Sequence, residues 1–372
     1  MLLILKNCKF ILAPMVEQSE LAWRILSRKY GSTLCYSPMI NSKVYIDPFQ
    51  KPYRDAIFST DPAVDRPLIA QLCGNDPEIV LQAAKMIEPH CDAIDLNLGC
   101  PQGIAKKGHY GSWLQDEWDL IASIVKKLRE NLQVPVTCKI RIFPDVEKSL
   151  KYAKMLQEAG CQALAVHGRT RDQKGPSTGL ADWDQIKRIK SELTIPVFAN
   201  GNILYHEDML KCLEYTGCDG VMVAEGSLYN PSIFTPDAHY PCWEMAEEYL
   251  GICRQYSTPA SMIRGHLFKM FRGTIPSFPS LREQLAMVKT LDEFESVTAQ
   301  LKEQLMLLHG TDIKGPMKGE MPLDSKGLKQ IPSYYCQPYI REAAKSHECI
   351  KESFEEGQGQ EQEQNKKIKL TQ

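Results

Sequence analysis

AIDLNLGCP, residues 93–101, joins an apolar run to a polar turn. The run is typical of a strand that is buried on both faces of a parallel sheet. In the turn, Cys100 stands between Gly99 and Pro101, and the loop that follows at 102–114 is basic and rich in glycine. Because parallel sheets bind ligands at the carboxyl ends of their strands, this turn predicts a functional site.

Seven more apolar runs of this kind occur before residue 227. They are FILAPM (10–15), TLCYSPM (33–39), PLIAQLC (67–73), VPVTCKIR (134–141), ALAVHGRT (163–170), PVFANGNI (196–203) and GVMVAEG (220–226). Helical patterns lie between them, and the pattern at 147–160 places Leu150, Ala153 and Leu156 on one face and ends at Gly160. Eight such β-α units predict a (β/α)8 TIM barrel, whereas a doubly wound open sheet rarely has eight regular repeats.

The chain changes character after the eighth run. Only helical periodicity is present between 243 and 308, which predicts a small all-helical domain. The sequence from 314 is rich in Pro, Gly and Lys, and the segment from 353 has too few apolar side chains to order itself. We therefore expect a barrel domain at 1–235, a helical domain at 240–312 and an extended, largely disordered tail at 313–372.

The composition is that of a globular protein with a substantial core. Of 372 residues, 43% are hydrophobic, and 44 basic against 46 acidic residues give a net charge of −2. This balance gives no general attraction to nucleic acid, so RNA binding would need a local basic patch. The 13 cysteines are unevenly spaced without a C-x-x-C or zinc pattern, which indicates reduced thiols and no metal site. Without a membrane span or a signal sequence, we expect a soluble cytoplasmic protein, with a nuclear fraction left open.

Polar groups end seven of the eight apolar runs, which packing alone does not explain. Lys139 lies inside such a run, and a buried ammonium needs an anionic or electron-rich partner. The last two run ends carry glycines, in ANGN (199–202) and AEGS (224–227). In barrels these two loops often hold a phosphate on backbone N–H groups, although two plain tight turns are the alternative.

These residues together resemble the dihydrouridine synthase family. The matching motifs, in order, are APM (13–15), Gln71, NLGCP (97–101), KIR (139–141), HGRTR (167–171) and ANGNI (199–203). The resemblance covers about residues 10–310 and is greatest to the eukaryotic subfamily that reduces uridines 16 and 17 of the tRNA D-loop. It implies an FMN-binding catalytic barrel, a helical domain that binds tRNA, and NADPH or NADH as the reductant.

The resemblance also implies which residues bind FMN. Pro14, Met15 and Val16 would line the flavin ring, and Gln71 and Lys139 would contact its edge, where a cation stabilises reduced flavin. His167 would face the cofactor as well. The residues expected at the phosphate are Asn200, Gly201, Asn202, Ala224 and Glu225. Many relatives have Arg where this chain has Glu225, so we expect a backbone contact at that position.

Uracil reduction requires a hydride at C6 and a proton at C5, and the flavin cannot protonate the opposite side of the base. A thiol with an ordinary pKa of about 8.5 is mostly protonated at neutral pH and can donate that proton. By resemblance, Cys100 is this donor, and the loop at 103–111 closes over the substrate. A buried structural thiol is the alternative, which we expect for Cys35, Cys73, Cys138 and Cys161.

The target base must leave the RNA stack to reach a flavin deep in the barrel. The residues expected to contact the base and the RNA backbone are Asn97, Arg141, Arg169, Arg171, Lys106 and Lys107. In the helical domain, a basic side is expected from Arg264, His266, Lys269 and Arg272, with Ile263, Leu267 and Met270 in the core. A merely solvated charged face is the alternative for these cations.

Two other functions stay open at this point. An FMN-dependent small-molecule reductase of the dihydroorotate dehydrogenase type would share the barrel but would not need the basic helical domain. A catalytically inactive RNA-binding barrel would not need the set formed by Gln71, Cys100, Lys139 and His167. The sequence has no G-x-G-x-x-G loop, so we expect the nicotinamide to visit the same mouth transiently. We also expect a monomer.

Overall fold

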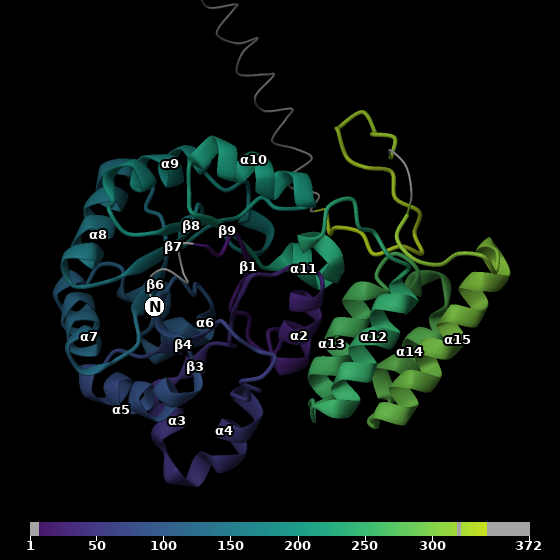
Figure 1. Cartoon of the computed structure of the whole chain (residues 1–372), viewed down its shortest axis with the longest axis horizontal. Coiled ribbons are helices and arrows are strands. Elements are labelled where there is room, and N and C mark those ends of the chain that lie inside the picture. Colours follow the sequence, from purple (N-terminus) through teal and green to yellow (C-terminus); the bar gives the residue numbers. More distant parts are fainter. Residues whose placement is uncertain (1–6, 318–320, 341–372) are drawn as a thin grey trace, which may run out of the picture.

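The computed structural model describes residues 7–317 and 321–340 (Figure 1). Its barrel strands are β1 (Phe10–Leu12), β2 (Leu34–Tyr36), β4 (Leu68–Cys73), β5 (Ala93–Leu98), β6 (Val136–Arg141), β7 (Ala163–His167), β8 (Val197–Asn200) and β9 (Gly220–Val223). They pair in parallel in the order β2-β1-β9-β8-β7-β6-β5-β4, and β2 also pairs with β4, which closes the barrel. Each strand lies within one of the eight apolar runs, so the predicted (β/α)8 barrel is confirmed. A further short strand, β3 (Ile40–Asn41), pairs with β4 and was not predicted.

Helices surround the barrel on its outer side (Figure 1). They are α2 (Leu21–Lys29), α3 (Ser42–Ile46), α4 (Lys51–Ile57), α5 (Pro77–Ile87), α7 (Trp118–Asn131), α8 (Val146–Glu158), α9 (Trp183–Glu192), α10 (His206–Thr216) and α11 (Glu225–Tyr229). The short helix α6 (Gly103–Gly108) lies instead within the ring in Figure 1, in the loop that follows β5. The predicted face of α8 is buried, and Gly160 follows the helix with a φ of +106°. A left-handed residue there ends the helix, as the sequence pattern predicted.

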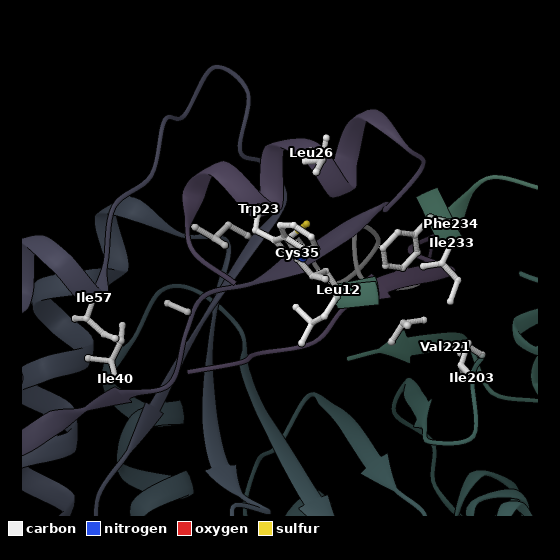
Figure 2. Packing of buried hydrophobic residues seen from close by; sticks show 14 of the residues in the cluster. Leu12, Trp23, Leu26, Cys35, Ile40, Ile57, Ile203, Val221, Ile233 and Phe234 are labelled. Atoms are coloured by element: carbon white, nitrogen blue, oxygen red, sulfur yellow. The ribbon is translucent and has the colours of Figure 1, made fainter. Parts of the chain in front are cut away.

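Alternate residues of the strands form two layers of core. One set packs outward against the helices, and in Figure 2 Trp23 of α2 lies over Leu12 of β1 and Cys35 of β2. The other set fills the barrel, and it includes Ile11, Leu34, Ile69, Ala93, Ala163, Ala165, Phe198 and Met222. Because the barrel is filled by side chains, ligand space is left only at its carboxyl-end mouth.

Four helices form the predicted helical part of the chain. They are α12 (Cys242–Gln255), α13 (Ala260–Met270), α14 (Pro279–Met287) and α15 (Leu291–His309). Helix α12 packs against α15 within this part and against α2 of the barrel (Figure 1). The predicted core residues Ile263, Leu267 and Met270 are buried.

His266 does not belong to a basic face, which corrects the sequence prediction. Its ring is fully buried and stacks on Trp23 with 3.8 Å between ring centroids. Nε2 of His266 lies 3.0 Å from the carboxylate of Glu20, which also accepts a hydrogen bond from the Tyr249 hydroxyl at 2.7 Å. Burial raises the pKa of Glu20, but His266 and the hydrogen bonds outweigh it and hold the pKa below its ordinary value. This network joins the barrel to the helical part.

Replacing Glu20 by alanine is expected to lower the free energy of unfolding by about 3–5 kcal/mol, because His266 and Tyr249 would stay buried without their acceptor. Denaturant unfolding at pH 7 measures the loss, and the exposed Glu283→Ala is the matched control. Since the folded-state pKa of Glu20 is depressed, its contribution should be present at neutral pH and disappear as the pH falls through that pKa. A loss of under 1 kcal/mol would contradict this role.

The described part of the tail follows an extended course but is firmly docked, which the sequence did not indicate. Lys329 forms an ion pair with Glu207 of α10 at 2.7 Å, and Cys336 is fully buried. Residues 341–372, which include the low-complexity segment from 353, lie outside the described residues. Within the described ranges, no helix combines the length and the apolar character needed to cross a membrane.

Candidate active site

The carboxyl ends of four neighbouring strands place one row of residues side by side. Arg141 of β6 is paired in register with His167 of β7, His167 with Asn200 of β8, and Asn200 with Met222 of β9. All four line a cavity of about 480 Å³ at the barrel mouth, and the turn after Cys100 forms part of its wall. These four strand ends therefore lie at one cavity of ligand size.

The backbone of Cys100 is held in a fixed turn. The side-chain oxygen of Asn97 accepts hydrogen bonds from the N–H groups of Gly99 at 3.1 Å and Cys100 at 2.9 Å. The carbonyl oxygen of Cys100 accepts from the N–H and the hydroxyl of Ser112, at 3.1 and 2.9 Å. Gly111 has a φ of +68°, and a Cβ there would lie 2.8 Å from the Cys100 carbonyl oxygen. Only glycine lets the loop pass so close, so the glycine-rich loop serves to fix this cysteine.

Cys100 is the only one of the cysteines in the described ranges that is not buried. Its partial burial raises the pKa of the thiol above the ordinary value, and the nearby cations Arg141 and Lys139 oppose this only in part. The thiol is therefore protonated at neutral pH and able to donate a proton. The cysteines predicted to be structural are buried, namely Cys35, Cys73, Cys138 and Cys161.

A buried carboxylate, Asp95, lies beneath this turn and was missed by the sequence analysis. It accepts hydrogen bonds from the side chains of Gln71 at 2.8 Å and Thr137 at 2.6 Å, and Gln71 in turn accepts one from Asn97 at 2.7 Å. Burial raises the pKa of Asp95 to about 6, against these hydrogen bonds and the charge of Lys139. Asp95 could have been identified from strand alternation, because residues two apart in a strand point to the same face and Asp95 therefore shares the inner face of β5 with Asn97.

Lys139 lies beside Asn97 in the strand register, within electrostatic range of Arg141, Asp95 and Cys100. Burial, followed by the charge of Arg141, lowers its pKa to about 8, while Asp95 and Cys100 act in the opposite direction. The ammonium makes no hydrogen bond or ion pair with any residue that the structure describes. A desolvated cation of this kind fits an anionic or electron-rich ligand, as the sequence predicted.

His167 is neutral and held by Arg169. Burial and the charges of Lys139 and Arg141 lower the pKa of His167 well below its ordinary value. Its Nε2 lies 3.0 Å from a guanidinium nitrogen of Arg169, so Nε2 accepts and the ring proton is on Nδ1. The side chain of Asn202 accepts from Arg169 at 3.0 Å. Asn202 therefore uses its side-chain oxygen to position Arg169, and its backbone N–H is left for a phosphate.

The far end of the cavity fits a phosphate. Gly201, Asn202 and Ile203 line the cavity, and their backbone N–H groups donate to no acceptor in the described residues. Gly201 has a φ of +118°, and the adjoining Gly226 packs so closely that a Cβ there would lie 2.6 Å from the Ile203 carbonyl oxygen. Unused backbone donors on glycine turns are suited to a phosphate group, and so this end fits FMN.

The remaining residues predicted to bind the cofactor lie in two places. Ala224 and Glu225 line the cavity next to the glycine turns. Pro14, Met15 and Val16 follow β1 at the same barrel end but do not line this cavity, and the Val16 side chain is 55% exposed.

Three cations surround the indole of Trp113 at the rim of the mouth. The side-chain charges of Lys106, Arg171 and Lys174 lie 4.8, 4.9 and 5.5 Å from its ring centroid. We call these four residues the Trp113 cluster. Lys107 is exposed on the same short helix as Lys106. The sequence predicted RNA contacts for Lys106, Lys107 and Arg171 but not for Trp113 and Lys174, because only the folded loops bring these residues together.

The two selected arginines of the helical part make different contacts. The guanidinium of Arg264 donates to the carbonyl oxygen of Val288 and lies 5.6 Å from the ring centroid of Phe294, within the helical part. The guanidinium of Arg272 lies 4.0 Å from the ring centroid of Tyr339, in the docked tail.

The barrel, the phosphate-fitting glycine turns and the protonated thiol together define an enzyme whose site lies at the barrel mouth. A family model described as dihydrouridine synthase matches residues 11–312. The chain belongs to this family of oxidoreductases, and the resemblance found in its sequence is confirmed.

Several named relatives are similar over most of their length. The chain is 48% identical over 346 residues to a Mus musculus tRNA-dihydrouridine(16/17) synthase-like protein, which covers 91% of this chain and 69% of the relative. It is 50% identical over 357 residues to the Schizosaccharomyces pombe tRNA-dihydrouridine(16/17) synthase, and the alignment covers 90% of this chain and 88% of that relative. A Homo sapiens tRNA-dihydrouridine(20a/20b) synthase-like protein is 35% identical over 263 residues, and the alignment covers 70% of this chain and 81% of that relative. All three names also carry NAD(P)+.

Proposed function

We propose that this protein reduces uridines 16 and 17 of the tRNA D-loop to 5,6-dihydrouridine, with FMN as the flavin and NADPH as the preferred reductant. The observation that carries the proposal is the fixed, protonated thiol of Cys100 beside the unpartnered cation of Lys139. Its support in the comparisons is the identity of 48–50% to proteins named for positions 16 and 17.

Bound FMN would supply the hydride that reaches C6 of the base. Its phosphate would accept hydrogen bonds from the backbone N–H groups at 201–203. Lys139 would face the electron-rich edge of the flavin ring, where the ammonium stabilises the negative charge of the reduced form. The other residues that we assign to the cofactor are Pro14, Met15, Val16, Gln71, His167, Asn200, Ala224 and Glu225.

Cys100 would act as the general acid. Its Sγ–H bond breaks as the C5–H bond of the base forms, and the thiolate is left near the positive charges of Lys139 and Arg141. Water then returns the proton to the thiolate. Because Asn97 and Ser112 hold the backbone of Cys100, the thiol does not need to search for its position when the base arrives.

The base and its RNA would be bound by the cations at the mouth. Asn97 donates one of its two amide hydrogens to Gln71, which leaves the other for the base. Arg141 donates Nε and Nη1 to backbone carbonyls, which leaves Nη2 for the substrate. We assign the flanking phosphates to Arg169, Lys107 and the Trp113 cluster, and a wider tRNA contact to the helical domain at 240–312. We propose that the protein acts as a monomer.

Replacing Asn97 by alanine is expected to lower the rate of tRNA reduction about 10- to 100-fold, because misplacing a reacting group by about 1 Å has an effect of this size. Bound flavin should be retained. Asn97→Asp keeps the acceptor for the Gly99 and Cys100 N–H groups and should recover part of the rate. Single-turnover reoxidation of reduced flavin by tRNA measures it, and equal rates for Asn97→Ala and wild type would contradict the positioning role.

Two other functions are distinguished by the substrate that reoxidises the flavin. A small-molecule reductase would be reoxidised by a free pyrimidine as fast as by tRNA. A catalytically inactive RNA-binding barrel would bind tRNA without reoxidation. The protonated thiol of Cys100 favours the dihydrouridine synthase activity, because simple RNA binding does not use a proton donor.

The direct test incubates the purified protein with FMN, NADPH and unmodified tRNA and maps dihydrouridine by nucleoside mass spectrometry. We expect dihydrouridine at positions 16 and 17. Product at other positions would overturn the proposed site, and bound, reducible flavin without any product would overturn the proposed substrate. Replacing NADPH by NADH in the same assay tests the reductant.

A further inference from the structure

The residues 332–340, which we call the C-terminal strap, run from the helical part to the mouth of the barrel. The N–H of Cys242 donates to the carbonyl oxygen of Tyr334, and the N–H of Cys336 donates to that of Tyr240, both at 2.9 Å. These bonds form a short antiparallel bridge beside the first turn of α12. The strap is thus tied to the protein through its backbone.

Side chains and a close backbone approach hold the strap further. Nδ1 of His239 lies 3.1 Å from the Cys336 carbonyl oxygen, and the Cys336 side chain is fully buried. A Cβ at Gly273 would lie 2.5 Å from the Ser333 carbonyl oxygen and 2.7 Å from a side-chain atom of Gln337. The strap therefore passes directly over Gly273, which lies three residues after the end of α13.

The end of the strap reaches the cavity. Tyr339 and Ile340 line it together with Ala224, Glu225 and Gly226, which adjoin the glycine turns. They are the only lining residues from the tail among those that the structure describes. The cavity that holds these glycine turns therefore has one wall that does not come from the barrel.

The ring of Tyr339 is held on two sides. It stacks on Tyr229 of α11, with 5.3 Å between ring centroids and 29° between planes. The guanidinium of Arg272 lies 4.0 Å from the centroid of Tyr339 and 5.9 Å from that of Tyr229. Stacking and cation–π contacts of this geometry favour one ring position. Arg272 therefore has structural partners in Tyr339 and Tyr229, and these contacts are a reason for a cation at this position that does not involve RNA.

We infer that the C-terminal strap is part of the cofactor site and that Tyr339, held by Arg272, closes the phosphate end and slows the release of FMN. This inference rests on the proposed binding of FMN. An aromatic wall over the backbone donors at 201–203 excludes water, and charge interactions with a phosphate are stronger where water is excluded. Arg272 adds a positive charge on the outer side of that wall. The strap thereby connects the helical part to cofactor retention.

The test measures the release of FMN and needs neither tRNA nor turnover. Each protein is loaded with FMN and diluted, and the recovery of free-flavin fluorescence gives the dissociation rate. We expect Tyr339→Ala to release FMN about tenfold faster, which corresponds to losing one well-packed aromatic contact and its cation. Arg272→Gln should release it about threefold faster, whereas Tyr339→Phe keeps the ring and should match wild type.

Two controls separate this effect from a folding defect. Arg282→Gln removes an exposed arginine of α14 and should leave the rate unchanged. Thermal unfolding of the flavin-free proteins reports folding, and Arg272→Gln remains informative if Tyr339→Ala unfolds. Wild-type release rates in both Arg272→Gln and a folded Tyr339→Ala would overturn the inference. Failure of the wild type itself to bind FMN would instead overturn the proposed cofactor, and this inference with it.

Discussion

Cys100→Ala is expected to bind FMN like the wild type and to reduce tRNA about 10²–10⁴ times more slowly, the usual loss when a general acid is removed. The thiol is protonated at neutral pH because burial raises its pKa, so the wild type carries the proton that the reaction needs. Its backbone is fixed by Asn97 and Ser112, so alanine changes the chemistry without releasing the turn. Single-turnover flavin reoxidation, together with dihydrouridine analysis, measures the effect.

The matched control for this variant is Cys218→Ala, which removes a buried thiol distant from the cavity wall. It should keep the wild-type rate of tRNA reduction. Cys100→Ser should recover little activity, because a hydroxyl is a far weaker acid than a thiol. Normal dihydrouridine formation by Cys100→Ala would remove Cys100 from the mechanism, and loss of bound FMN would assign it a structural role.

Lys139→Met is expected to lower the midpoint potential of the bound flavin by about 30–60 mV. A hydrogen bond to a charged group contributes about 1.5–3 kcal/mol. For a two-electron couple, about 1.4 kcal/mol corresponds to about 30 mV of midpoint potential. The charged lysine stabilises the reduced flavin more than the oxidised one, so its removal makes reduction harder. Redox titration against a reference dye measures the shift, and the exposed Lys107→Met is the control.

The pH dependence of this effect follows from the pKa of Lys139, which burial lowers to about 8. Below pH 8 the side chain is mostly charged, and above it the charge is lost. The advantage of the wild type over Lys139→Met in binding reduced flavin should therefore be larger at pH 7 than at pH 9. An advantage that grows with pH would contradict the assignment of Lys139 to the flavin.

The fold was predictable because its signals are local. Each barrel strand lies within a mainly apolar run, and Gly160 ends α8 as its position predicts. The strand β3 was missed because two residues carry no periodicity. His266 was misassigned because helical spacing cannot reveal that the barrel supplies Glu20 as its partner.

The site was predictable in position where its residues lie near a strand end, as for Cys100, Lys139 and His167, whose roles stay predictions. It was not predictable where distant segments meet. Trp113 gains its three cations from two loops, and Tyr339 reaches the cavity from a segment read only as an extended tail. Contacts between segments so far apart in the chain leave no pattern in a single sequence.

The ammonium of Lys139, which has no hydrogen-bond or ion-pair partner among the described residues, also has a consequence for the lifetime of the protein. A desolvated cation destabilises the flavin-free form, and a ligand that binds only the folded state stabilises it by about 2.7 kcal/mol at 100 times its dissociation constant. Quality-control proteases remove chains in proportion to how often they open. Cells deprived of riboflavin would therefore degrade this enzyme faster, and its abundance would follow the vitamin supply without any change in transcription.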